Sequence, residues 1–196
     1  ENWYGAVTDT NSGDTTYSIT DPDAIQAIVD AGGTDTLDLS GMEQRSIVDL
    51  TPGAYSSLGY WSMADQVTYY SSLTGASAAT VQGIFDTYDT ISTSANISGG
   101  TTSSGGVYER QNNFGIAHSA VIENVIGSSG DDEITGNTAD NEITGGSGDD
   151  TIDGGSGNDT AIFTGRFSEY TITDNNDGTH TIADTTAGRD GSDTIS

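Results

Sequence analysis

The sequence predicts an all-β protein that contains a right-handed parallel β-roll, further β-sandwich-like strands, an inserted loop and helix region and a C-terminal β-hairpin. Three observations predict this class. Residues 127–162 form four consecutive nonapeptides with fixed glycine and aspartate positions. Two apolar-alternating runs flank an Asn-Asn-Asp-Gly turn near residue 176, as in a hairpin. Within the inserted region, residues 81–88 place apolar residues at helical spacing, which predicts one helix there.

The nonapeptides read GSSGDDEIT, GNTADNEIT, GGSGDDTID and GGSGNDTAI. Each begins with glycine, and three further positions are nearly constant. Position four is Gly130, Ala139, Gly148 and Gly157; position six is Asp132, Asn141, Asp150 and Asp159; position eight is Ile134, Ile143, Ile152 and Ala161. This is the known calcium-binding G-G-x-G-x-D-x-U-x repeat of RTX proteins.

The spacing of the repeat has a physical reason. Six residues form a turn whose glycines adopt positive φ, and three form a short strand with its apolar residue pointing inward. Two nonapeptides complete one coil, and coils stack at about 4.8 Å. Carbonyl and aspartate oxygens of stacked turns then form an oxygen cage suited to Ca²⁺. A Gly/Asp/Ser-rich stretch is otherwise typical of a flexible linker, but a period held over four copies favours calcium binding.

The chain is strongly acidic. Its 30 Asp and Glu residues face only four cations, which gives a formal charge of −26 with no lysine. Such a chain stays disordered unless something cationic neutralises it, although salt adaptation also explains acidity. Nucleic acid is excluded as a partner, because no basic stripe is present to meet phosphates.

Cysteine is absent, so a metal ion is the expected internal cross-link of an extracellular fold. No apolar run reaches the length of a membrane span, and the first residues do not resemble a signal peptide. We expect the chain to be a fragment of a longer protein.

Three further segments carry a family resemblance, together with the repeats. They are Trp3–Ala6 with Asn11–Tyr17, the D-x-G-G-x-D-T-x-D segment Asp30–Asp38, and His118–Gly127. In this order they resemble the C-terminal domain of serralysin-type secreted metalloproteases of the M10 family, which includes an RTX β-roll.

The resemblance implies several calcium sites. The first would use Asn11, Gly13, Thr15, Asp30, Gly32 and Asp35, and the second Gly33, Asp35, Val121 and Glu123. One roll site would join Ser128, Gly130 and Asp132 to Gly145, Ser147 and Asp150. Another would join Asn137, Ala139 and Asn141 to Gly154, Ser156 and Asp159. We expect this last site to be weaker, because Asn141 is neutral.

A further roll site at Gly146 and Gly148 is not predicted, because different sequence begins at Phe163 and no upper turn is evident. The segment Gly188–Thr194 faintly resembles the first calcium loop and is a lesser candidate for another ion.

We divide the chain into a β region over 1–126, the roll over 127–163 and a hairpin region over 164–196. An insertion at about 60–112 holds an expected helix around Val81, Ile84, Phe85 and Tyr88. Its aromatic residues form a candidate sugar-binding platform or pack the insertion onto the fold: Tyr60, Trp61, Tyr69 and Tyr70. Before the first calcium loop, Asp21-Pro22-Asp23 indicates a helix start, but we favour a strand at Ala27–Asp30.

No catalytic site is predicted. The family's zinc motif needs H-E-x-x-H, whereas His118 and His180 are isolated and are expected to be structural. Gly75–Ala79 differs by one residue from a nucleophile elbow and lacks the preceding strand.

The sequence therefore predicts a non-catalytic, monomeric module of a secreted, extracellular bacterial protein, which folds on binding Ca²⁺. The resemblance adds type I secretion machinery as a partner and a metalloprotease-like parent. The alternative is a carbohydrate-binding or adhesion module. Glycan binding that is lost in Trp61→Ala would favour this alternative.

Overall fold

In the computed structural model of the protein, residues 5–7, 12–21, 26–60, 62–94 and 113–196 are described. They form short strands and two α-helices, so the chain is mostly β as predicted. The helices lie in a compact unit of their own, residues 61–109, which falls within the predicted insertion. The strands belong to the other unit, which combines residues 1–60 with residues 110–196.

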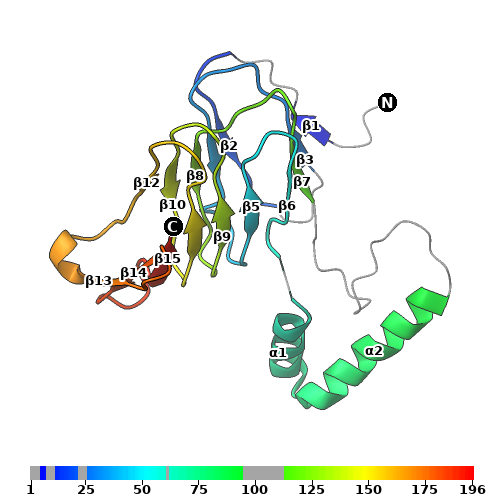
Figure 1. Ribbon diagram of the computed structural model, residues 1–196. Coiled ribbons are helices and arrows are strands. Elements are labelled where there is room, and N and C mark those ends of the chain that lie inside the picture. The colour runs from blue at the N-terminus through cyan, green and yellow to red at the C-terminus, as the bar shows by residue number, and fades with distance from the viewer. Residues whose placement is uncertain (1–4, 8–11, 22–25, 61, 95–112) are drawn as a thin grey trace. The chain divides into compact units, whose positions relative to one another are not determined.

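The first large sheet is entirely parallel (Figure 1). Its order is β12-β10-β8-β4-β2. These strands are β2 (Thr16–Ser18), β4 (Thr36–Asp38), β8 (Asn124–Ile126), β10 (Glu142–Thr144) and β12 (Thr160–Ala161). Strands from the N-terminal region therefore continue the same sheet as strands from the nonapeptides, and their turns stack in one column.

The second large sheet has the order β13-β14-β15-β11-β9-β5. Its parallel part contains β5 (Ile47–Asp49), β9 (Glu133–Thr135), β11 (Thr151–Asp153) and β15 (Ser192–Ile195). The antiparallel hairpin of β13 (Tyr170–Asp174) and β14 (His180–Asp184) joins it through β15. The nonapeptides thus alternate between the two large sheets.

One core lies between these sheets. Each three-residue strand turns a single apolar residue inward, as the x-U-x pattern predicts. Leu37, Val125 and Ile143 from the first sheet and Val48, Ile134 and Ile152 from the second are at most 4% exposed. Each repeat strand thus contributes one residue to this core, and loop residues such as Leu39, Leu50 and Ile122 add to it.

A third sheet covers the N-terminal part of this unit. It contains β1 (Gly5–Val7), β3 (Gln26–Ile28), β7 (Phe114–Ile116) and β6 (Tyr55–Ser56), in the order β1-β3-β7-β6. The prediction of a strand before the first calcium loop is confirmed, although β3 begins and ends earlier than Ala27–Asp30.

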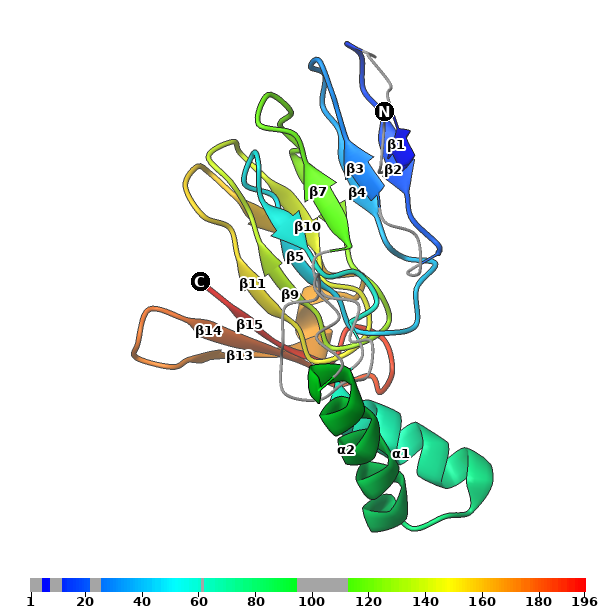
Figure 2. The same ribbon diagram turned by 90° about the vertical axis from the view of Figure 1, so that its right-hand side faces the viewer.

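The predicted hairpin is confirmed. Tyr170 pairs with Asp184 and Asp174 pairs with His180 across it. Asn176 and Gly178 adopt positive φ in the connecting turn, which fits the Asx/Gly prediction. Figure 2 shows the hairpin extending away from the parallel strands on the side where β15 joins them.

The position of β15 corrects one prediction. We expected no turn above Gly146 and Gly148, because the repeat pattern stops before Phe163. In the structure the chain returns after the hairpin, and β15 pairs in parallel with β11, with Ile195 opposite Ile152. The prediction failed because the hairpin interrupts the nine-residue period.

The helical unit contains the predicted helix and one more. The helix α2 (Ala78–Ser94) is confirmed, whereas α1 (Met63–Thr74) was not predicted. Ser62 caps α1 by accepting a hydrogen bond from the Asp65 N–H, and Gly75 ends it in the left-handed conformation. Ser77 is the serine of the segment that nearly matches a nucleophile elbow. Its hydroxyl accepts a hydrogen bond from the Thr80 N–H, as a helix cap does. Neither described helix is long and apolar enough to cross a lipid bilayer.

Candidate metal centre

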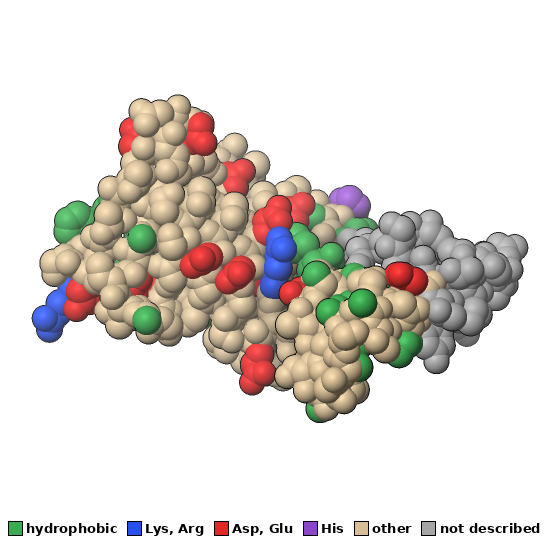
Figure 3. All heavy atoms as spheres, turned by 90° about the horizontal axis from the view of Figure 1, so that it is seen from below, with side chains coloured by type: hydrophobic (Ala, Val, Ile, Leu, Met, Phe, Trp, Pro, Cys, Tyr) green, Lys and Arg blue, Asp and Glu red, His purple; other side chains and the backbone are tan. Residues whose placement is uncertain are grey.

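Several carboxylates of this acidic chain lie inside the fold instead of on its surface. Asp30, Asp35, Asp132, Asp150 and Asp193 are at most 3% exposed. Figure 3 shows other carboxylates, in red, scattered singly or in small groups over the face drawn. Salt adaptation places acids on the surface, whereas burying a charge is costly unless a cation or donors compensate it. The burial therefore favours the metal interpretation of the acidity.

The first column of turns aligns Thr15, Asp35 and Glu123. The parallel register of β2, β4 and β8 places these residues one above another, immediately before their strands. The Thr15 N–H donates to Asp35 Oδ1 at 2.8 Å, and the Asp35 N–H donates to Glu123 Oε2 at 2.8 Å. Each carboxylate thus reaches the backbone of the adjacent turn, which brings together residues 20 and 88 positions apart.

Asp30 occupies the start of the first predicted calcium loop. Its carboxylate accepts hydrogen bonds from the Gly32 N–H at 2.6 Å and from the hydroxyl of buried Tyr17. Burial opposes ionisation of Asp30, but these hydrogen bonds outweigh it and lower the pKa of the carboxyl. Asp30 is therefore held as an anion beside Asp35. Sequence reasoning missed Tyr17, although its place two residues after Thr15 in a strand indicated an inward side chain.

Asp35 has an oxygen with no partner. The residue is fully buried, and Oδ2 has no hydrogen-bond partner. Burial, the Asp30 charge and the Glu123 charge raise the pKa of Asp35. An unpaired, buried carboxylate oxygen next to other carboxylates fits a divalent cation shared by the first two predicted sites.

The second column repeats this arrangement with Ser46, Asp132 and Asp150. The Ser46 N–H donates to Asp132 Oδ1 at 2.5 Å, and the Asp132 N–H donates to Asp150 Oδ1 at 2.7 Å. Asp150 Oδ2 is buried and has no hydrogen-bond partner. Burial, together with the charges of Asp193 and Asp132, raises the pKa of Asp150 to about 8. Sequence reasoning missed Ser46, because no repeat pattern marks its loop.

These shifts predict a pH dependence of the calcium-free chain. Asp150 has a folded-state pKa of about 8, whereas an unfolded aspartate titrates near 4. Between these values the folded state binds more protons, so stability in EDTA should fall as pH rises from about 5 to about 8. The residual β signal in EDTA, followed by circular dichroism, should therefore decrease from about pH 5 to about pH 8, and Asp150→Asn should reduce this decrease. An EDTA sample that gains stability with rising pH would contradict the expectation.

Close approach of the turns explains the glycines at the second and fourth positions. Gly146 has a φ of 112°, and a Cβ there would lie 2.0 Å from the Ser128 carbonyl oxygen. A side chain would therefore force the two turns apart. This packing is what brings carbonyl oxygens of successive turns together.

The predicted site at Asn141 is built differently. The Asn141 amide donates to the Glu123 carbonyl at 2.8 Å, and its Oδ1 accepts from the Asn137 N–H at 2.9 Å. Asn137 likewise donates to the Ile122 carbonyl at 2.8 Å. Amide groups thus bridge turns where the other turns have carboxylates. Weaker calcium binding at this site stays a prediction.

In the described part of the chain, backbone oxygens are needed to complete a metal site. No cluster of three or more His, Cys, Asp or Glu side chains suited to a metal occurs among the residues that the structure describes. Each candidate site instead pairs one or two carboxylates with backbone oxygens of two stacked turns. Oxygen-only donor sets of this kind suit Ca²⁺, which accepts six to eight oxygen ligands.

The predicted ligands fall into the two columns, except that Asn11 lies outside the described residues. The others occupy turns at 13–15, 30–35, 121–123, 128–132, 137–141, 145–150 and 154–159. Of the two histidines, His118 lies against Gly53, and His180 lies exposed in β14 opposite Ile195.

The aromatic platform falls into two units. In the strand unit, the Arg45 guanidinium carbon lies 5.8 Å from the centre of the Tyr60 ring. In the helical unit, Tyr69 and Tyr70 are in edge contact at 5.2 Å, and Tyr70 also contacts Phe85. Trp61 lies outside the described residues. The sugar-binding role stays a prediction.

Comparison with known families matches two parts of the chain. Residues 126–161 match the RTX calcium-binding nonapeptide repeat in four copies. Residues 2–95 match the Peptidase M10 serralysin C-terminal family. No curated protein matches the chain. Calcium is therefore the cofactor of the repeats, and the matched regions are of non-catalytic kinds.

Proposed function

We propose that this chain, which carries RTX calcium-binding repeats and a segment similar to the serralysin C-terminal region, is a module that folds on binding calcium outside the cell. The observation that carries the proposal is the pair of buried, unpartnered carboxylate oxygens, Asp35 Oδ2 and Asp150 Oδ2. Each would face a large desolvation cost if no cation were bound.

Calcium concentration would control folding through linkage. An ion that binds only the folded state stabilises it by about 2.7 kcal/mol per site when present at a hundredfold excess over Kd. Cytosolic calcium is far below the level that extracellular-type sites require, which is about 10⁻⁴–10⁻³ M. Several such sites would together match the net stability of an ordinary domain, about 5–15 kcal/mol.

The parallel registers support a right-handed parallel β-roll as the folded form. The ions would be held between turns, by Asp30, Asp35 and Glu123 in the first column and by Asp132 and Asp150 in the second. Backbone oxygens of the same turns would complete each site. Calcium would supply the positive charge that neutralises these carboxylates.

The family matches also support a proposal about the longer protein to which this chain belongs. Both matched regions are typical of secreted bacterial proteins. We infer a secreted, metalloprotease-like parent that leaves the cell by type I secretion, with this chain as its monomeric, non-catalytic module. Secretion in an unfolded state and folding at millimolar calcium would follow from the same linkage.

A calcium titration tests the proposal. The chain is exposed to free calcium from about 10⁻⁷ to about 5 × 10⁻³ M, and β structure is followed by circular dichroism. We expect a cooperative gain of β signal between about 10⁻⁴ and 10⁻³ M. Magnesium at equal concentration is the control, and it should fail because it prefers a tighter octahedron with retained water. Full β signal at the lowest calcium level, or an equal response to magnesium, would refute the proposal.

A further inference from the structure

The segment that follows the hairpin is a fifth nonapeptide. Residues 188–196 read GRDGSDTIS, with glycine at positions one and four, Asp193 at position six and Ile195 at position eight. It lies outside residues 126–161, which match the repeat family. The register of β15 on β11 aligns it with the nonapeptide that begins at Gly145, so that Asp193 stands above Asp150.

Hydrogen bonds repeat from one step of the column to the next. The Asp150 N–H donates to Asp193 Oδ1 at 2.8 Å, as the Asp132 N–H donates to Asp150 Oδ1 at 2.7 Å. The Thr194 N–H donates to the Asp150 carbonyl at 2.8 Å, as the Thr151 N–H donates to the Asp132 carbonyl at 2.8 Å. The upper turn is therefore placed on the lower one in the same way as within the recognised repeats.

The turns also approach closely at position four. Gly191 has a φ of 75°, and a Cβ there would lie 1.7 Å from the Gly148 carbonyl oxygen. Only glycine fits this contact. The same approach occurs one step lower, where a Cβ on Gly148 would lie 2.8 Å from the Gly130 carbonyl oxygen.

The two stacked turns contain buried carboxylates that lack a compensating charge. Asp150 is 1% exposed and Asp193 is 2% exposed. Asp150 Oδ2 has no hydrogen-bond partner and points into its own turn, 2.2 Å from where a Cβ of Gly145 would lie. Two stacked, buried carboxylates with an unpaired oxygen require a cation or a proton.

We infer that the turn Gly188–Asp193 closes an additional calcium site on the turn Gly145–Asp150. Asp150 and Asp193 would be its carboxylate ligands. Backbone oxygens of Gly146, Gly148, Gly188 and Asp190 would complete it. These residues occupy the same repeat positions as the predicted backbone ligands of the lower roll site. The inference rests on the proposed calcium function and adds a site that the four recognised repeats do not contain.

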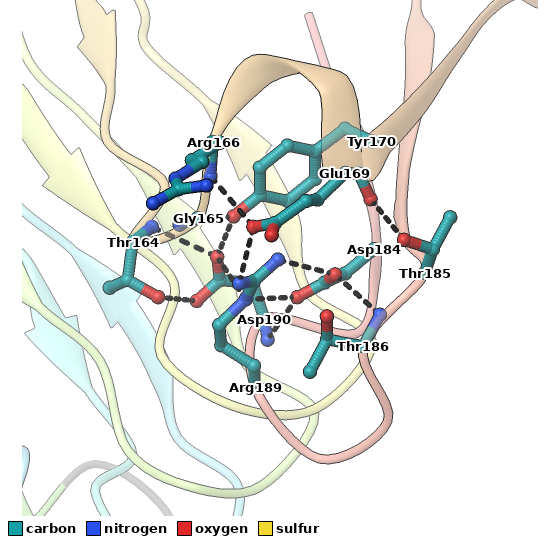
Figure 4. Close-up of polar contacts among 10 residues, drawn as sticks. All are labelled: Thr164, Gly165, Arg166, Glu169, Tyr170, Asp184, Thr185, Thr186, Arg189 and Asp190. Carbon is teal, nitrogen blue, oxygen red and sulfur yellow. Dashed lines mark hydrogen bonds and ion pairs between the residues drawn. The ribbon is translucent and has the colours of Figure 1, made fainter.

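The hairpin holds this turn in place (Figure 4). The Asp190 carboxylate accepts hydrogen bonds from the Thr164 N–H at 2.9 Å, from the Thr164 hydroxyl at 2.8 Å and from the Tyr170 hydroxyl. Arg189 donates to Asp184 at 2.6 and 2.7 Å and to Glu169 at 2.8 Å. These contacts fix both ends of the inserted hairpin to the fifth repeat.

The hairpin also occupies a backbone carbonyl of the fifth repeat. The Gly191 carbonyl, which at position four would serve a site above, accepts a hydrogen bond from the Asp184 N–H at 2.7 Å. Arg189 occupies position two, where three of the four recognised repeats have glycine or serine. The position-four carbonyl of the fifth repeat is therefore already engaged by the hairpin.

Counting bound ions tests the inference. Calcium stoichiometry is measured on the folded chain by native mass spectrometry for the natural sequence, for Asp193→Asn and for Asp131→Asn. Asp193→Asn retains an acceptor for the Asp150 N–H but removes the charge. Asp131→Asn is the matched control, because Asp131 is exposed and its carboxylate likewise accepts a backbone N–H of the next turn, that of Asp149. We expect Asp193→Asn to lose one ion, or to raise the Kd of one site at least tenfold, and Asp131→Asn to match the natural sequence.

The outcomes are separable. An unchanged ion count and affinity in Asp193→Asn would overturn the additional site, and the proposed function would stand. Absence of calcium binding to the natural chain would overturn both. If Asp193→Asn does not fold, amide NMR of the folded, calcium-loaded natural chain replaces it: exchange of the bound Ca²⁺ for Cd²⁺, an ion of similar size, should shift the signals of residues 190–194 but not those of the hairpin tip at 176–178. Unshifted signals at 190–194 would also overturn the inference.

Discussion

Removing calcium with EDTA at neutral pH is expected to abolish most of the β structure of this chain and its cooperative thermal transition. The core holds only one inward apolar residue per repeat strand, such as Ile134 and Ile152. The buried carboxylates oppose folding, because without an ion they retain an uncompensated charge or must take up a proton. Each occupied site that is lost removes about 2.7 kcal/mol at a hundredfold calcium excess, so the loss of several sites is comparable to the usual net stability of a domain, about 5–15 kcal/mol.

The measurement is circular dichroism with a thermal scan, in EDTA and again after excess calcium is restored. The control is EDTA with about 1 M NaCl, at which the Debye length falls to about 3 Å and exposed charges are screened. If the acidity were salt adaptation, salt alone would restore the fold. An EDTA sample with unchanged β signal and melting temperature would refute the calcium requirement, and recovery in salt alone would favour salt adaptation.

Asp35→Ala is expected to be far more damaging than Asn141→Ala. Asp35 is fully buried, has an unpartnered oxygen and lies where two predicted sites meet. Its replacement should remove up to two bound ions, and with them about 5 kcal/mol at a hundredfold calcium excess. It also removes the acceptor of the Thr15 N–H.

Asn141→Ala is the matched control, because it also truncates a buried side chain in the same column. Asn141 donates to the Glu123 carbonyl and accepts from the Asn137 N–H. Loss of these hydrogen bonds should cost about 1–3 kcal/mol and at most one weakly held ion. Ion counts and melting temperatures in saturating calcium distinguish the two variants. Equal losses in both would show that Asp35 holds no more calcium than a neutral amide does.

Elements with strong local signals were predicted from the sequence. The nine-residue period predicted the turns and strands between residues 127 and 161, and the helical spacing of apolar residues predicted α2. The Asn-Asn-Asp-Gly turn gave the hairpin. The helix α1 was missed, although Ser62 and Asp65 have the spacing of a capping box. Its weak apolar pattern gave no periodic signal.

The candidate sites were predicted in part. The ligand types and their spacing follow from the repeat and from the family resemblance. The partners that hold the carboxylates were not predicted: Tyr17 contacts Asp30, and Ser46 contacts Asp132. These contacts join loops that have no common motif, so only the fold brings them together.

By itself, the sequence determined that this protein is built from short glycine-rich turns and single-apolar strands, and that its carboxylates are spaced for calcium. These properties are local, because turn conformation and strand direction depend on neighbouring residues. Only the tertiary structure decided which turns stack on which, and it placed Asp193 on Asp150 across the intervening hairpin. Parallel pairing joins strands regardless of the length of chain between them, so a site formed between two turns is fixed by register and not by sequence distance.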